Sequence, residues 1–202
     1  MARLKSFFRK GVLESGCDEA GRGCLAGPVV AAAVILPKGW NHKLLNDSKL
    51  LCEDHRNIVR AKIENDFEHW AVGFASPQEI DEINILNASF LAMHRALDQL
   101  NIIPDLILVD GNRFKPYRDI NHECIVKGDQ KMRVIAAASI LAKTHRDEWM
   151  TRLHHDFPQY NWMQNKGYPT RAHREALAMH GPCIHHRYSF SWQPTPEVQE
   201  SN

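Results

Sequence analysis

Four acidic residues follow segments whose composition predicts buried strands: Asp18, Glu19, Asp110 and Asp129. Asp18 and Glu19 end the segment 11–20, Asp110 ends "LILVD", and Asp129 follows "CIVKG". Ligands of open α/β sheets bind beyond the carboxyl ends of the strands, so these carboxylates can meet at one edge. Crowded carboxylates repel one another unless a cation lies among them, and Mg²⁺ and Mn²⁺ prefer oxygen ligands. The four acids therefore indicate a divalent-metal site.

Each acid, taken alone, also has a purely structural explanation. Asp110 begins an Asp-Gly turn, and Asp129 precedes a long predicted helix whose N-terminus favours an acid. Adjacent strand residues point to opposite faces, so Asp18 and Glu19 share one site only if the strand ends or bulges there. Gly21 and Gly23 make such an ending possible. Metal binding and local capping both remain open for each acid at this point.

The glycines of the same stretch allow a second interpretation. Gly21, Gly23 and Ala26 match the spacing G-x-G-x-x-A of dinucleotide-binding folds, with Asp47 near the position of a ribose-binding acid. That fingerprint opens a helix, whereas Pro28 and the valines after it predict a strand. Two acids at the strand end would also repel a pyrophosphate. We keep a dinucleotide-binding protein as the alternative and expect no binding of NAD or NADP.

Strands and helices alternate along the chain. Strands are predicted within 11–20, 29–36, 69–75, 106–110 and 123–129, and helices within 53–70, 76–100 with a break near Asn84, 133–157 and 170–181. This alternation predicts an α/β fold with a partly parallel sheet. We expect a single domain over 1–202, with loose termini at 1–12 and 191–202.

Composition narrows the class of protein. The chain has 202 residues, 44% of them hydrophobic, and a net charge of +1, so any anion site must come from local clustering rather than from a global basic field. The five cysteines are scattered without a C-x-x-C pair, which favours a reducing compartment. No signal peptide or membrane-length apolar run is present. We expect a cytoplasmic protein that does not enter membranes.

The histidine pairs 154–155 and 185–186 lack the spacing of helical metal sites, and we interpret them as surface or structural polar groups.

Eight motifs occur in an order that resembles one family. Between Gly16 and Phe190 the chain carries "DEAGRGCLAGPVVAAAVIL", "LNDSK", "IDEINILNASFLAMHRAL", "LVDGN", "IVKGD", "AAASILAK", "NKGYPTRAH" and "HRYSF". This ordered set resembles type 2 ribonuclease H in its bacterial form, ribonuclease HII. The resemblance implies a ribonuclease H-like fold, with a mixed five-stranded sheet flanked by helices and a helical C-terminal part.

The resemblance also implies an activity. The family hydrolyses the RNA strand of RNA–DNA hybrids and nicks DNA 5′ of embedded ribonucleotides, leaving 5′-phosphate and 3′-hydroxyl ends. It implies Mg²⁺ or Mn²⁺ as cofactor, with two ions during catalysis, and hybrid or ribonucleotide-containing duplex DNA as partner of a monomer. Protein partners cannot be read from the motifs. A non-catalytic nucleic-acid-binding module of the same fold is an alternative, against which the four intact acids argue.

The site residues implied by the resemblance divide into two groups. The catalytic metal ligands are Asp18, Glu19, Asp110 and Asp129, the acids already selected from the strand ends. The substrate-binding residues are Gly21, Arg22 and Gly23 at the 2′-hydroxyl, Tyr168 on the next deoxyribose, and Lys49, Lys143 and Lys166 at phosphates, with ordinary surface charge as the alternative for the lysines. Cys24, Leu50, Thr144 and His145 depart from the family's usual residues.

Overall fold

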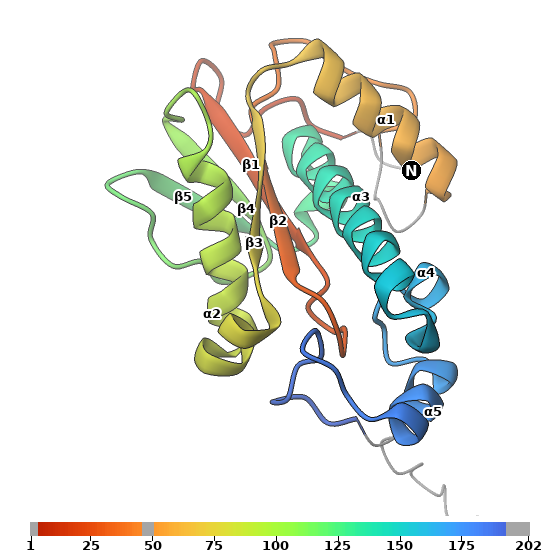
Figure 1. Cartoon of the computed structure of the whole chain (residues 1–202). Coiled ribbons are helices and arrows are strands. Elements are labelled where there is room, and N and C mark those ends of the chain that lie inside the picture. Colours follow the sequence, from red (N-terminus) through yellow and green to blue (C-terminus); the bar gives the residue numbers. More distant parts are fainter. Residues whose placement is uncertain (1–3, 46–50, 193–202) are drawn as a thin grey trace, which may run out of the picture.

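The computed structural model describes residues 4–45 and 51–192, and one five-stranded sheet runs through its centre. The strands are β1 (Glu14–Ala20), β2 (Val29–Val34), β3 (Trp70–Ala75), β4 (Leu106–Asp110) and β5 (Asn121–Ile125), in the order β3-β2-β1-β4-β5. The β1–β2 and β2–β3 pairs are antiparallel, and the β1–β4 and β4–β5 pairs are parallel. The predicted mixed five-stranded sheet is therefore confirmed (Figure 1).

Helices cover both faces of the sheet. They are α1 (Glu53–Asp66), α2 (Pro77–Asp98), α3 (Arg133–Asp156), α4 (Trp162–Asn165) and α5 (Arg171–His180), with single 3₁₀ turns at Gly128–Gln130 and Pro158–Tyr160. Figure 1 shows α2 on one side of the sheet, α3 with α1 on the other, and α5 beyond the end of α3. None of these helices is long and apolar enough to cross a bilayer, as far as the described residues go.

Side chains alternate in direction along each strand, so each face of the sheet has its own hydrophobic core. Toward α2 the core contains Cys17, Val29, Ala31, Ala33, Ile107 and Val109 of the sheet with Ile80, Ala88, Ala92, Met93 and Ala96 of the helix. Toward α1 and α3 it contains Ala32 and Val34 with Val59, Ile63, Ala136, Ala137, Ile140 and Leu141. Successive residues of one strand thus enter different cores, which fixes the face to which each neighbouring polar residue points.

Helix α3 lies unusually close to the central strand. A Cβ atom built on Gly16 of β1 would overlap the backbone of Val134 and Ile135 at the start of α3. The next turn is Ala136, Ala137 and Ala138, all fully buried. Small residues on both sides therefore let the helix backbone rest on β1, as the alanine-rich sequence predicts.

The second long helix starts as its sequence predicts. Ser76 accepts a hydrogen bond from the backbone N–H of Glu79, and the Glu79 carboxylate accepts from the Ser76 N–H, which forms a capping box. The predicted break near Asn84 is confirmed, because Asn84 adopts φ 64 inside α2. Beyond this kink α2 packs along β2 and β3 and covers one face of the sheet.

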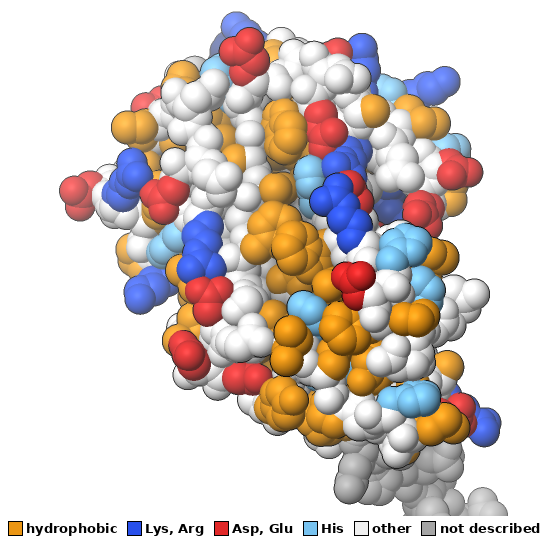
Figure 2. All heavy atoms as spheres, viewed as in Figure 1, with side chains coloured by type: hydrophobic (Ala, Val, Ile, Leu, Met, Phe, Trp, Pro, Cys, Tyr) orange, Lys and Arg blue, Asp and Glu red, His pale blue; other side chains and the backbone are white. Residues whose placement is uncertain are grey.

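Strand β3 is one of the two edge strands of the sheet, and side chains of α2 occupy some of its outward-facing carbonyls. The Arg95 guanidinium donates to the carbonyl of Phe74 at 2.7 Å, and the Gln99 amide donates to the carbonyl of Val72 at 3.0 Å. Figure 2 shows hydrophobic side chains gathered in the middle of the face that carries β3 and α3. The rings of Phe74 on β3 and Trp149 on α3 lie 5.3 Å apart. The capped carbonyls disfavour pairing with another strand.

One expectation about a segment end is wrong. Strand β5 ends at Ile125 rather than at Asp129, because Lys127 adopts a left-handed conformation, φ 55, and turns the chain into the 3₁₀ turn Gly128–Gln130. Near the start of the described residues, the Lys5 N–H donates to the Lys131 carbonyl, and the Lys5 carbonyl accepts from the Arg133 N–H; loose termini stay a prediction. At the other end, the Trp192 indole donates to the Arg187 carbonyl at 3.2 Å, and residues 193–202 lie outside the described part.

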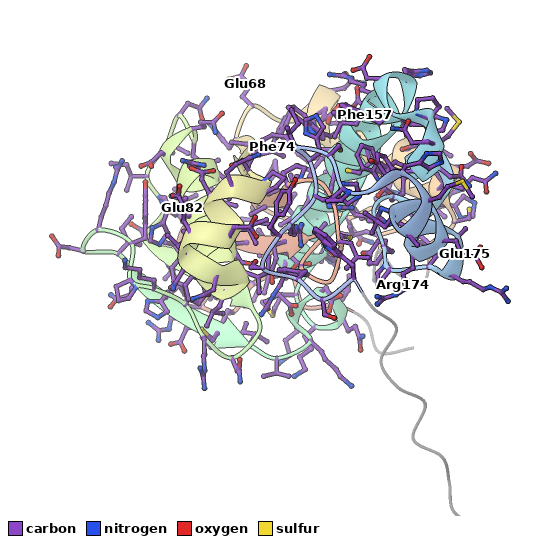
Figure 3. All side chains as sticks on the ribbon, turned by 60° about the horizontal axis from the view of Figure 1, so that its bottom comes forward. Glu68, Phe74, Glu82, Phe157, Arg174 and Glu175 are labelled. Carbon is purple, nitrogen blue, oxygen red and sulfur yellow. The ribbon has the colours of Figure 1, made fainter. Side chains whose placement is uncertain are left out.

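The C-terminal part forms its own small core against the end of α3. Met150, Tyr160, Trp162 and Leu177 are buried there, with Phe157 packed beside them. Figure 3 shows Phe157 near the end of α3 and Arg174 and Glu175 on α5 close by. The expected helical C-terminal part is thus present, and it is attached to the sheet mainly through α3.

His186 belongs to this small core and is fully buried. Its Nδ1 accepts a hydrogen bond from the Cys183 N–H at 3.0 Å. Burial, reinforced by the nearby His173, lowers the pKa of His186 from 6.5 to about 4. The unfolded chain therefore binds this proton at a higher pH than the folded chain does.

We predict that folding stability falls as pH drops from 6.5 toward 4. His186 stabilises the fold fully above its unfolded-state pKa, and lowering the pH from 7 to 5 should cost about 2 kcal/mol of unfolding free energy. Urea unfolding at the two pH values measures this loss. The His186→Gln variant should lose most of that pH dependence, whereas the exposed His180→Gln variant should retain it. An identical pH dependence in all three proteins would contradict the assignment.

Candidate active site

The two neighbouring acids of β1 point to opposite faces of the sheet. Pairing with β2 stays regular through Glu19↔Ala31 and Ala20↔Val30, so no bulge intervenes. Glu19 shares the face of Cys17, toward α2, and Asp18 shares the face of Gly16, toward α3. The condition under which both acids would enter one site from a single face is not met, and they flank the end of β1 instead.

Asp110 links the two acids. It ends β4, which pairs with β1 in parallel, and its charge acts on both Asp18 and Glu19. Its Oδ1 accepts a hydrogen bond from the Gly128 N–H at 2.6 Å. This bond holds the 3₁₀ turn Gly128–Gln130 against the end of β4. It thereby places the next residue, Asp129, near Asp110, and Asp129 is only 2% exposed. Three separate chain segments thus bring the four acids to one end of the sheet.

Burial and like charge destabilise the ionised form of these carboxylates. The pKa of Asp18 is raised well above its usual value, first by burial and then by repulsion from Glu19 and Asp110, although a Ser139 hydrogen bond opposes the rise. The pKa of Glu19 is also raised by burial, against the attraction of Arg22, whose guanidinium lies 3.1 Å from the Glu19 carboxylate. A cation placed here would relieve both effects.

The residues fit a divalent cation by charge and donor chemistry. Buried carboxylate oxygens are ligands of hard ions such as Mg²⁺ and Mn²⁺. Within the described residues, however, no three His, Cys, Asp or Glu side chains are gathered as a ready-made metal cage. The fit therefore rests on the repulsion among the acids and on their position, and Asp18 with Asp110 forms its centre.

A cleft opens beside the acids on the α2 side. Its polar wall is formed by Glu19, Arg22, Asp110, Gly111, Asn112 and Arg113, and its apolar floor by Leu86, Ser89, Phe90 and Met93 of α2. Anionic and cationic groups therefore face one hollow. Such a lining suits a phosphate-containing ligand held near carboxylates.

Two buried arginines hold the loop after β1 through hydrogen bonds to its backbone carbonyls. Arg146 donates to the carbonyls of Ala26 and Pro28, and Arg187 donates to those of Arg22 and Gly27. Both side chains are fully buried, and neither forms an ion pair with a carboxylate in the part of the chain that the structure describes. Burial, and then the neighbouring Arg146, lowers the pKa of Arg187 to about 9.

Sequence reasoning missed both arginines. Arg is ordinarily exposed, and nothing in "THRDEW" or "HRYSF" shows that the side chain turns inward. The only available signal was the location of Arg187 inside one of the family motifs. Their hydrogen bonds to backbone carbonyls explain how a charged side chain is tolerated in this interior.

The two glycines of the loop differ in their surroundings. Gly21 has φ +95, and a Cβ atom there would overlap the guanidinium of Arg146. Gly23 has open space on its Cβ side. Packing within the protein therefore requires glycine at position 21, whereas nothing in the protein itself requires it at position 23.

Helix α3 carries three site residues on one face. Ser139 lies at Asp18, Lys143 lies one turn later beside Tyr168, and Arg146 lies beneath Gly21. The spacing i, i+4, i+7 places them along a single stripe. One helix thus aligns the acids, the loop and the tyrosine.

Tyr168 is 40% exposed, and its ring lies against this stripe. The Lys143 ammonium is 5.3 Å from the ring centroid and the Arg146 guanidinium is 5.8 Å from it. Burial, and then the neighbouring Cys24, raises the pKa of Tyr168. The structure thus brings Tyr168, Lys143 and the Gly21–Gly23 loop together.

The other predicted phosphate ligands are placed differently. The Lys166 ammonium donates to the Thr151 hydroxyl at 2.8 Å and to the Met163 carbonyl at 2.7 Å, while Lys143 pairs with Asp147 at 2.8 Å. Lys49 lies outside the described residues, as do Asp47 and Leu50. A phosphate role for the lysines stays a prediction.

The dinucleotide-binding alternative is wrong. The loop after β1 leads into β2, which is antiparallel to β1, and not into a helix. A pyrophosphate site of that type needs the N-terminus of a helix directly after the glycines.

Comparisons with known proteins agree with this geometry. The family model described as Ribonuclease HII matches residues 15–193. A Ribonuclease HII of Bacteroides thetaiotaomicron is 59% identical over 188 residues, which are 93% of this chain and 94% of the relative.

Solved structures show the same fold. The ribonuclease H2 of Pyrococcus horikoshii OT3 has a TM-score of 0.73 at 26% identity, covering 89% of this chain and 94% of that one. The ribonuclease HII of Archaeoglobus fulgidus, solved as a PCNA:RNase HII complex, has a TM-score of 0.74 at 25% identity, covering 91% and 98%. The chain therefore belongs to the ribonuclease HII family and is a ribonuclease H, an endoribonuclease.

Proposed function

We propose that the protein is a metal-dependent endoribonuclease that hydrolyses the RNA strand of RNA–DNA hybrids and nicks duplex DNA 5′ of embedded ribonucleotides. The products carry 5′-phosphate and 3′-hydroxyl ends. The observation that carries this proposal is the placement of Asp18 and Glu19 near the end of β1 and of Asp110 at the end of β4, where the Gly128 N–H bond to Asp110 brings in the buried Asp129. A binding module of the same fold would have no use for acids that repel one another inside the protein.

Asp18, Glu19, Asp110 and Asp129 would hold Mg²⁺ or Mn²⁺, with two ions present during catalysis. When bound, such ions activate a water and stabilise the leaving 3′ oxygen. The residues around the acids position them: Ser139 hydrogen-bonds Asp18, and the Gly128 N–H holds Asp110.

The loop after β1 would select the ribose at which the strand is cut. Gly21, Arg22 and Gly23 would face the 2′-hydroxyl, which is the group that distinguishes RNA from DNA. The open space at Gly23 supports a close approach of a sugar to the backbone. Tyr168 would pack on the deoxyribose that follows, with Lys143 near its phosphate.

The proposed substrate is bound by a monomer in the cytoplasm. Local rather than global charge supports the binding, since the net charge is only +1 while Arg22 and Arg113 line the cleft.

We predict that Asp110→Asn abolishes most Mg²⁺-dependent cleavage while the protein stays folded. The asparagine Oδ1 can still accept from the Gly128 N–H, so only the charge is removed. Metal-assisted charge stabilisation is worth several kcal/mol, so kcat should fall about 100-fold or more. Cleavage of a labelled duplex with one ribonucleotide measures it, with the exposed Asp119→Asn as control. Full activity of Asp110→Asn would refute the four-acid site.

We predict opposite consequences for the two loop glycines. Gly21→Ala should lower the unfolding free energy by at least about 1 kcal/mol, because φ +95 is strained and Arg146 must shift. Gly23→Ala should leave stability unchanged and weaken cleavage by keeping the ribose away from the backbone. Urea unfolding and kcat/KM separate the two effects. Unchanged kcat/KM in Gly23→Ala would argue against a ribose contact at this position.

We predict that Tyr168→Ala loses more kcat/KM on a single-ribonucleotide duplex than on a long RNA–DNA hybrid, whereas Tyr168→Phe is mild. A ring packed on a deoxyribose contributes dispersion and apolar burial that the phenylalanine keeps. The salt dependence of binding should not change, because no phosphate contact is removed. Equal losses on both substrates would make Tyr168 a general packing residue.

A further inference from the structure

Two fully buried imidazoles lie behind the segment that carries Tyr168. His173 comes from α5 and His186 from the chain that follows it, and their Nε2 atoms are 3.2 Å apart. The fully buried indole of Trp162 lies beside both rings, with its Nε1 3.1 Å from the His173 Nε2. No catalytic step assigned above uses these three side chains.

The hydrogen-bond partners determine where each proton lies. The Cys183 N–H donates to His186 Nδ1 at 3.0 Å, so the proton of His186 is on Nε2. That N–H and the Trp162 indole N–H both point to His173 Nε2, which must therefore accept. The proton of His173 is then on Nδ1, where it is donated to the Tyr168 carbonyl at 2.9 Å.

The chain of hydrogen bonds ends on the backbone of the tyrosine that faces the active site. Residues 165–170 form a tight loop in which the Tyr168 N–H donates to the Asn165 carbonyl at 2.8 Å. The Gly167 carbonyl accepts from the Leu25 N–H at 2.8 Å, which ties this loop to the Gly21–Gly23 segment. His173 supplies the side-chain hydrogen bond at the Tyr168 carbonyl, which also accepts from the Thr170 N–H at 2.8 Å.

The surroundings keep the pair neutral. Burial lowers the pKa of both imidazoles; the charge of Arg174 adds to this at His173, and those of His173 and His185 add to it at His186. Tyr160, whose ring centroid lies 4.6 Å from that of His186, and Cys183 are further titratable neighbours. If His173 carried its proton on Nε2, this N–H would face the N–H groups of Trp162 and His186. Neither of these donors would then have an acceptor, and the chain of hydrogen bonds would be broken.

We propose that His173 and His186 are positioning residues that hold Tyr168 in the orientation in which it distinguishes an RNA–DNA junction from continuous RNA. The proposal rests on the proposed role of Tyr168. A single tautomer of each ring is required, and Trp162 and the Cys183 N–H select it. Loss of the bond to the Tyr168 carbonyl therefore changes substrate preference without removing any group that touches the substrate.

Two substitutions of His173 separate this bond from the rest of the core. In His173→Asn the side-chain amide takes the place of Nδ1 and can still donate to the Tyr168 carbonyl. In His173→Gln the amide carbonyl takes the place of Nε2, so Trp162 and His186 keep their acceptor. The Tyr168 carbonyl loses its side-chain donor and keeps only the Thr170 N–H at 2.8 Å. His180→Gln on the exposed side of α5 is the matched control.

The experiment is a double-mutant cycle on both substrates. His173→Gln should reduce the preference for the single-ribonucleotide duplex over the long hybrid by about five- to tenfold, the worth of one neutral hydrogen bond, and mainly through kcat. His173→Asn should restore much of it. In a Tyr168→Ala background His173→Gln should have no further effect on the preference. Equal losses in both backgrounds, or no rescue by asparagine, would overturn the proposal.

A second measurement is independent of activity. Imidazole ¹⁵N spectra at pH 7 should show His173 protonated on Nδ1 and His186 on Nε2, and the Tyr168 ring signals should shift in His173→Gln but not in His180→Gln. The opposite tautomers, or unmoved ring signals, would overturn the proposal. If Tyr168→Ala alone leaves the substrate preference unchanged, the proposed role of Tyr168 fails, and these spectra still decide whether the pair positions it.

Discussion

The contact of α3 with β1 is the constraint on which the rest of the site depends. Gly16 removes the side chain that would separate helix from strand, and the alanine turn that follows keeps them close. Once the helix is seated there, its stripe of Ser139, Lys143 and Arg146 is carried over the end of β1. A bulkier residue at position 16 would displace all three together, because a helix moves as a rigid body.

The second principle of the site is the use of backbone carbonyls to hold buried charge. Arg146 and Arg187 are surrounded by carbonyl oxygens of the loop after β1, which satisfies their donors without neutralising them. The nearby acids Asp18 and Glu19 are also buried, but the groups close to them include other carboxylates, which disfavour their ionised form. The buried arginines are thus compensated by backbone carbonyls, whereas a bound cation would compensate the buried acids.

The C-terminal part connects with this arrangement both through a shared apolar cluster, in which Leu25 and Ala26 pack with Trp162, and through hydrogen bonds. The Leu25 N–H joins the Tyr168 loop to the Gly21–Gly23 segment, and His173 holds the same loop from the interior. The loop after β1 and the loop that carries Tyr168 are therefore mechanically linked. Such directional bonds set position more sharply than hydrophobic packing, which tolerates small shifts.

Hydrophobic periodicity and capping signals determined the strands, the long helices and the break at Asn84, and the strand-end rule selected the four acids, because these are local properties of the chain. The path of Asp129 to Asp110 was beyond the sequence, since it depends on a left-handed Lys127 and a bond from the Gly128 N–H. The inward turn of Arg146 and Arg187, and the proton positions of His173 and His186, were also decided only by tertiary structure. Each of these depends on which distant carbonyl or N–H lies opposite the side chain, and residue type alone does not encode that partner.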